Sequence, residues 1–192
     1  MKAGAGIVHE EFHSARYAQL GADFEMIHLW VNLPARDKMA RPGYQGITDA
    51  QLPRIELADN AGTVRVMAGS FDGKAGPARS FTPMNVWDLR ARAGKSLNLA
   101  LPNGHATALF VLSGALRLPG GQIVQSGELA VMQREGEQLA FEALQDATVL
   151  RLKGESILDP IVGYGPFVMH SEPEIRQAMN DYRSGRMGRI DA

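Results

Sequence analysis

The feature that most constrains the fold is a series of short segments, between residues 24 and 154, in which apolar and polar side chains tend to alternate. Successive side chains of a β-strand point to opposite faces of the sheet, so this alternation predicts half-buried strands. Turn residues separate the segments, as in "LPNG" at 101–104 and "LPGGQ" at 118–122. Many short strands joined by such turns are typical of an all-β fold, an antiparallel sandwich or barrel. The predicted strands cover residues 24–33, 63–71, 86–91, 96–101, 107–118, 129–133, 138–144 and 148–154.

A long segment rich in Pro, Asp and Gly, from Leu33 to Gly62, interrupts the strands. Connections of this length are uncommon inside one compact domain, so we place a domain boundary near residue 60. The chain then divides into a first segment at 1–60, a barrel at 61–160 and a C-terminal segment at 161–192.

The C-terminal segment contains "GPFVM" at 165–169, a predicted strand, and then the clearest helix of the chain, at 172–184. Ser171 can cap this helix, and Glu174 follows at the spacing of a capping box. Apolar residues recur on one side of the helix, so we expect it to dock on a barrel through them. They are Ile175, Ala178, Met179 and Tyr182.

Composition and charge exclude several classes of protein. The chain has no cysteine, so any metal must be held by His, Asp or Glu. A net charge of -1 with scattered Lys and Arg argues against direct binding to nucleic acid. No apolar run approaches the roughly 18 residues of a membrane span, and no signal peptide is recognisable. We therefore expect a cytoplasmic protein that binds no membrane.

Two of the five histidines lie in "HEEFH" at 9–13. On a helix this is the H-E-x-x-H motif of zinc proteases, with Glu10 as the general base between His9 and His13. Two glycines and two β-branched residues stand directly upstream, and both disfavour a helix that includes the motif. The sequence therefore argues against a zinc protease.

On an extended strand, His9 and Glu11 share one face and Glu10 points to the other. An imidazole and a carboxylate together are half of the ligand set of a non-haem iron, manganese or nickel site. The alternative is a solvated cluster on an edge strand. Spacing alone leaves both interpretations open.

Three longer stretches identify a resemblance that covers essentially the whole chain. They are "AGAGIVHEE" at 3–11, "IHLWVNLPARDKMARPGYQ" at 27–45 and "DPIVGYGPFVMHSEPEIRQAMNDYRSGRMG" at 159–188. Taken in order, they resemble the landmarks of the pirin family. The resemblance implies a bicupin, that is, two cupin-like antiparallel β-barrels in one chain, with a C-terminal α-helix.

The same resemblance implies one metal site, in the N-terminal barrel. Pirins hold iron or a similar metal there with three histidines and one glutamate. By this resemblance His9 is the last histidine ligand and Glu11 the glutamate ligand, whereas Glu10 and His13 are not ligands. The second barrel offers only His105 in the comparable stretch, so we expect no metal there.

The chain departs from the family at its start. The first two histidine ligands of pirins come from an H-P-H segment upstream, and nothing precedes Met1 here. We therefore expect a fragment or a gene with a misassigned start, in which 1–60 is the remnant of the N-terminal barrel. An incomplete barrel has open edges, which favour self-association.

Two other residues could contribute to the pocket. On a strand, His28 shares a face with Trp30, and both would line the pocket if this strand neighbours His9. A half-buried histidine packed beside Trp30 is the equal alternative. His13 is a weaker substitute ligand.

Function follows the resemblance. The leading hypothesis is an iron-dependent quercetin 2,3-dioxygenase when the protein is complete, with a flavonol-like substrate. Glu11 would act as ligand and as the base for the flavonol 3-hydroxyl. The alternatives are a non-catalytic pirin-type regulator that binds a protein partner, and a truncated fragment without metal.

Overall fold

The computed structural model describes residues 1–21, 23–100 and 104–190. By their contacts they form two compact units: Met1–Tyr44 with Ile157–Ala192, and Gln45–Ser156. The structure thus groups residues 45–60 with the barrel, whereas the sequence analysis placed them with the first segment.

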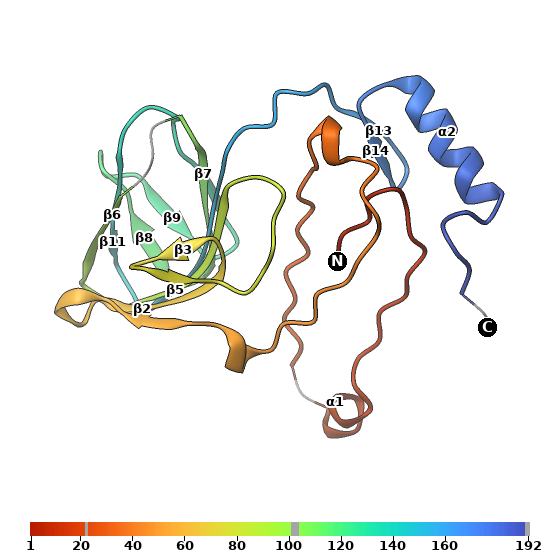
Figure 1. Cartoon of the computed structure of the whole chain (residues 1–192). Coiled ribbons are helices and arrows are strands. Elements are labelled where there is room, and N and C mark those ends of the chain that lie inside the picture. The colour runs from red at the N-terminus through yellow and green to blue at the C-terminus, as the bar shows by residue number, and fades with distance from the viewer. Residues whose placement is uncertain (22, 101–103, 191–192) are drawn as a thin grey trace. The chain divides into compact units, whose positions relative to one another are not determined.

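The larger unit is built from two antiparallel sheets that face each other (Figure 1). Six strands pair in the order β1-β2-β5-β12-β7-β10, and four pair in the order β6-β11-β8-β9. The six are β1 (Arg54–Glu56), β2 (Gly62–Ala68), β5 (Met84–Ala91), β12 (Ala147–Gly154), β7 (Ala106–Ser113) and β10 (Leu129–Val131). The four are β6 (Ser96–Ala100), β11 (Gln138–Ala143), β8 (Ala115–Arg117) and β9 (Ile123–Gln125). A small hairpin, β3 (Ser70–Phe71) with β4 (Lys74–Ala75), and the 3-10 turns Asp49–Gln51 and Ala58–Asn60 complete the unit.

The core of this unit lies between the two sheets. Alternate residues of both sheets point inward, and Leu89, Leu109 and Leu116 are fully buried there. Burying one such side chain contributes roughly 1.5–3 kcal/mol, so the inward-facing residues of the alternating strands stabilise the fold. No helix longer than a 3-10 turn lies between residues 63 and 154 in the described part of the chain, as expected for a barrel.

One predicted strand, 107–118, is two strands in the structure. Gly114 separates β7 from β8, with φ of 82°. A Cβ at this position would stand 2.5 Å from the carbonyl oxygen of Asp146. The chain passes from one sheet to the other at a residue that only glycine can occupy without strain.

In the smaller unit, the predicted strand and the predicted C-terminal helix are both present. β13 (Val162–Tyr164) and β14 (Phe167–Met169) form a hairpin, and α2 (Glu172–Arg183) packs on it (Figure 1). Ile175 and Ala178 are buried, whereas Tyr182 is 54% exposed and its ring centroid lies 6.3 Å from that of Phe167, in an edge arrangement. Of the predicted docking residues, Ile175 and Ala178 are thus buried, and Tyr182 contributes a partly exposed aromatic contact to β14.

The predicted strand at 24–33 is absent, and this prediction is wrong. Its apolar side chains are largely exposed, for example 55% for Phe24 and 68% for Trp30. A strand needs a neighbour to accept its backbone hydrogen bonds, and no described segment pairs with these residues. The regular elements before residue 45 are α1 (Ala15–Leu20) and the 3-10 turn Ala35–Asp37.

Within the described residues, no helix is long and apolar enough to cross a membrane.

Candidate functional site

His9 and Glu11 lie side by side on an extended segment that follows a turn at Gly4 and Gly6. The Nδ1 atom of His9 is 3.7 Å from Oε1 of Glu11. Their side chains are 40% and 56% exposed, so both can reach a ligand from solvent. Just upstream, the backbone N–H of Val8 donates to the carbonyl of Met187, at 2.9 Å, and ties the segment to the C-terminal part of its own unit.

The structure contains no helix over residues 7–13, so the arrangement of a zinc-protease motif is not formed. His13 lies in an aromatic cluster instead. Its ring centroid is 4.5 Å from that of Phe24 and 5.8 Å from that of Tyr17. The contacts of the His13 ring are thus with Tyr17 and Phe24.

Whether the residues present fit a metal can be tested on this pair. The ring nitrogen of His and the carboxylate oxygen of Glu are suitable ligands for iron, manganese or nickel. Among the described residues, however, no group of three or more His, Cys, Asp or Glu side chains is placed to hold an ion. The pair therefore fits half of a metal site and does not form a complete one.

His28 and Trp30 are the two residues predicted to line a pocket beside this half-site. Both are exposed, in the stretch where the predicted strand is absent. The alternation that would have put them on one face beside His9 needs a paired strand. Their role in lining a pocket stays a prediction.

The buried polar groups of the smaller unit lie elsewhere. Nζ of Lys38 donates to Oδ1 of Asn32, and Lys38 is only 8% exposed. Burial lowers the pKa of Lys38, and the negative charge of Glu174 partly opposes this. Glu174 also accepts hydrogen bonds from the Ser171 hydroxyl and the His170 N–H, both at 3.0 Å. These contacts hold the start of α2 and do not involve His9 or Glu11.

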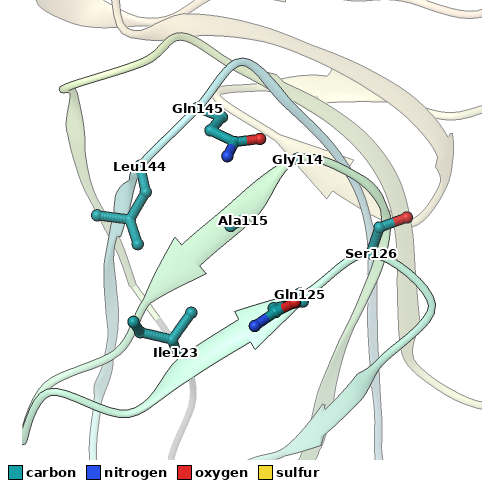
Figure 2. Close-up of a pocket in the computed structure, with 7 residues that line it drawn as sticks. All are labelled: Gly114, Ala115, Ile123, Gln125, Ser126, Leu144 and Gln145. Atoms are coloured by element: carbon teal, nitrogen blue, oxygen red, sulfur yellow. The ribbon is translucent and has the colours of Figure 1, made fainter.

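A hollow on the larger unit lies at the end of strands β8 and β9 (Figure 2). Its lining comprises Gly114, Ala115, Ile123, Gln125, Ser126, Leu144 and Gln145. None of these residues is ionisable near neutral pH, and the Ser126 hydroxyl already donates to the carbonyl of Leu112, at 2.8 Å. The hollow therefore has the shape of a cleft without groups for catalysis.

The sequence analysis missed one buried charge inside the barrel. Arg151 on β12 is 0% exposed, and its guanidinium carbon is 3.8 Å from the centre of the Trp87 ring on β5. None of its three side-chain nitrogens has a hydrogen-bond partner among the described residues. The signal was present in "TVLRLKG", where Arg151 takes an inward position of an otherwise apolar alternation.

Comparison with known proteins identifies the chain. The family model of the pirin C-terminal cupin domain matches residues 86–188, which is more than half of the chain. The chain belongs to the pirin family. The predicted fold class, all-β and cupin-like with a C-terminal helix, is thereby confirmed together with the antiparallel sheets described above.

Individual pirin relatives are similar along almost the whole chain. The Pseudomonas aeruginosa protein named "Putative quercetin 2,3-dioxygenase" is 47% identical over 97% of this chain. A pirin-like protein of Caulobacter vibrioides is 34% identical over a similar share, 97%. The chain spans 65% of the length of the first of these relatives and 66% of the second.

A solved structure agrees with this pirin architecture. The crystal structure of a quercetin 2,3-dioxygenase from Acinetobacter baumannii matches with a TM-score of 0.94 and 41% identity. The match covers 98% of this chain and 66% of that one.

Proposed function

We propose that this chain supplies half of the metal site of a pirin-type, iron-dependent quercetin 2,3-dioxygenase, with His9 and Glu11 as its ligands. The observation that carries the proposal is the 3.7 Å approach of His9 Nδ1 to Glu11 Oε1 on an accessible segment. The supporting context is the similarity of almost the whole chain to proteins named quercetin 2,3-dioxygenase. We place this function in the cytoplasm.

The two residues have different roles in the proposal. His9 binds the metal through a ring nitrogen and has no other role. Glu11 has two carboxylate oxygens, so one can bind while the other accepts the proton of a flavonol 3-hydroxyl group. The carboxylate is 56% exposed, which leaves it open to a substrate.

The first test is metal binding by this 192-residue chain. Two ligands leave most coordination positions to water, so we expect weak, substoichiometric binding of iron. The measurement is the iron retained after equilibrium dialysis, for the wild-type chain, His9→Ala, Glu11→Gln and the control Glu10→Gln. Binding should fall in the first two variants and stay unchanged in the control.

Equal retention of iron in all four proteins would contradict the assignment of His9 and Glu11. Stoichiometric iron with turnover of quercetin by this chain would show instead that the ligand set is complete, and His28 and His13 would be the next residues to substitute. Reading the coding DNA upstream of Met1 tests the same point. An in-frame H-P-H segment would supply the two further histidines.

A second candidate is a regulatory protein that binds a protein partner without catalysis. It is favoured by the exposed apolar side chains between residues 24 and 31, which include Met26 at 61% and Val31 at 55%. Clustered exposed apolar residues mark interaction surfaces or self-association sites. We expect the chain to self-associate through this surface, and sedimentation velocity across a concentration series measures it. A monomer at all concentrations would contradict this expectation.

A further inference from the structure

Polar side chains lie at one end of the barrel interior, outside the proposed metal site. In the pairing register, Arg151 stands between Trp87 on β5 and Leu109 on β7. The next inward row places Lys153 between Asn85 on β5, whose side-chain oxygen accepts from the Ser70 N–H, and Thr107 on β7. These residues share one interior face because side chains alternate along each strand.

Several hydrogen-bond donors on this face have no acceptor among the described residues. The three nitrogens of Arg151, the Trp87 Nε1 and the Thr107 Oγ1 are buried and have no hydrogen-bond partner among the described residues. Arginine and tryptophan side chains can only donate. A ligand that satisfies them must therefore be rich in acceptors and need no donors, which is the chemistry of an anion.

The charges on this face also favour an anionic ligand. Burial lowers the pKa of Arg151 to about 10. Burial, and then the neighbouring charge of Arg151, lower the pKa of the Lys153 ammonium. A fully buried cation, Arg151, thus has a second, partly buried cation, Lys153, as its neighbour, and no ion pair joins either of them to a carboxylate of the described residues. A buried charge without a counter-ion is costly.

We propose that the interior of this barrel binds a small carboxylate, held by the guanidinium of Arg151. The planar fork of arginine matches the two oxygens of a carboxylate in a bidentate geometry. The guanidinium carbon lies 3.8 Å from the centre of the Trp87 ring, and the indole N–H and the Thr107 hydroxyl offer further donors. Arg151 is 0% exposed, so the ligand in this proposal is small, of the size of formate or acetate. This site is separate from the proposed metal site and does not depend on it.

The test uses Trp87 as the reporter. The chain has two tryptophans, so Trp30→Phe leaves Trp87 as the single tryptophan, which is excited selectively above the absorption of tyrosine. Sodium formate and sodium acetate are titrated against sodium chloride at constant ionic strength, and both the Trp87 emission and the melting temperature are recorded. We expect a saturable emission change and a saturable rise in melting temperature with the carboxylates. Arg151→Met should abolish both responses, and Arg92→Met, which removes an exposed arginine, should keep them.

A second measurement needs no substitution at Arg151. The formate proton should show a nuclear Overhauser effect to the Trp87 indole when formate is bound. Failure to observe this effect, together with identical titrations for Arg151→Met and its parent, would overturn the proposal. An equal response to chloride would overturn the assignment to carboxylates. Iron binding at His9 and Glu11 plays no part in these measurements, so the two proposals fail independently.

Discussion

The β12 strand and residues 24–33 have similar sequence patterns and opposite structures. Both alternate apolar and polar side chains, but β12 pairs with β5 on one side and β7 on the other, whereas 24–33 pairs with no described strand. Leu150 of β12 is 3% exposed and Trp30 is 68% exposed. The comparison shows that alternation reports the face a side chain would take, while pairing decides whether the strand exists.

The largest expected effect comes from removing α2, which packs on the β13–β14 hairpin of the smaller unit. Truncation after His170 removes Ile175 and Ala178, the buried face of α2. Losing this packing should unfold the β13–β14 hairpin, because an isolated two-stranded hairpin is marginal at best. Hydrogen exchange at residues 162–169 measures it, with truncation after Gly188 as the control. The barrel amides should stay protected, and unchanged protection of the hairpin would contradict the prediction.

Two leucines give the direct test of paired against unpaired alternation. Leu109→Ala should lower the free energy of unfolding by about 2–5 kcal/mol, since Leu109 is 0% exposed in the barrel core. Leu29→Ala should change it by no more than about 0.5 kcal/mol, since Leu29 is 41% exposed. Urea unfolding monitored by circular dichroism measures both. A large effect at Leu29 would show that residues 24–33 are packed in solution.

Two glycines with similar φ angles allow the cost of a left-handed backbone to be distinguished from the cost of a steric clash at an added Cβ. Gly114 and Gly120 have φ of 82° and 87°, but only Gly114 has backbone atoms within 3 Å of an added Cβ. Gly120→Ala should cost about 1–2 kcal/mol, the strain of a left-handed conformation, and Gly114→Ala should cost more. Thermal unfolding of the two variants compares them. Equal losses of stability in the two variants would mean that the backbone near Gly114 shifts easily to accommodate a Cβ.

The smallest effect is a pH dependence at the start of α2. Hydrogen bonds from the Ser171 hydroxyl and then from the His170 N–H hold the pKa of Glu174 below its ordinary value of 4.5. The ionised carboxylate therefore stabilises the folded state above that value, and this contribution is lost as pH falls through the lowered pKa. Amide exchange in α2, followed from pH 6 downward, should show weakening that Glu174→Gln removes and Glu172→Gln does not.

The barrel could be predicted largely from sequence, and the candidate site only in part. Alternation located most strands because each buries one face, and the Ser171–Glu174 spacing located the start of α2. Alternation could not locate the change of sheet at Gly114, which depends on the distant backbone of Asp146. The approach of His9 to Glu11 follows from local spacing. Arg151 escaped notice because a charged residue in a strand is ordinarily assigned to the exposed face.

The strand order has a consequence for how the chain folds during synthesis. β12, at 147–154, lies between β5 and β7 in the six-stranded sheet, yet it is the last strand of that sheet to leave the ribosome. Until it arrives, β2 with β5 and β7 with β10 are two separate halves whose inner edges are unpaired. Contacts between residues far apart in sequence close slowly, and unpaired edges invite pairing with other chains. A nascent barrel that pairs its other strands before β12 arrives is therefore open at its centre and not at its rim.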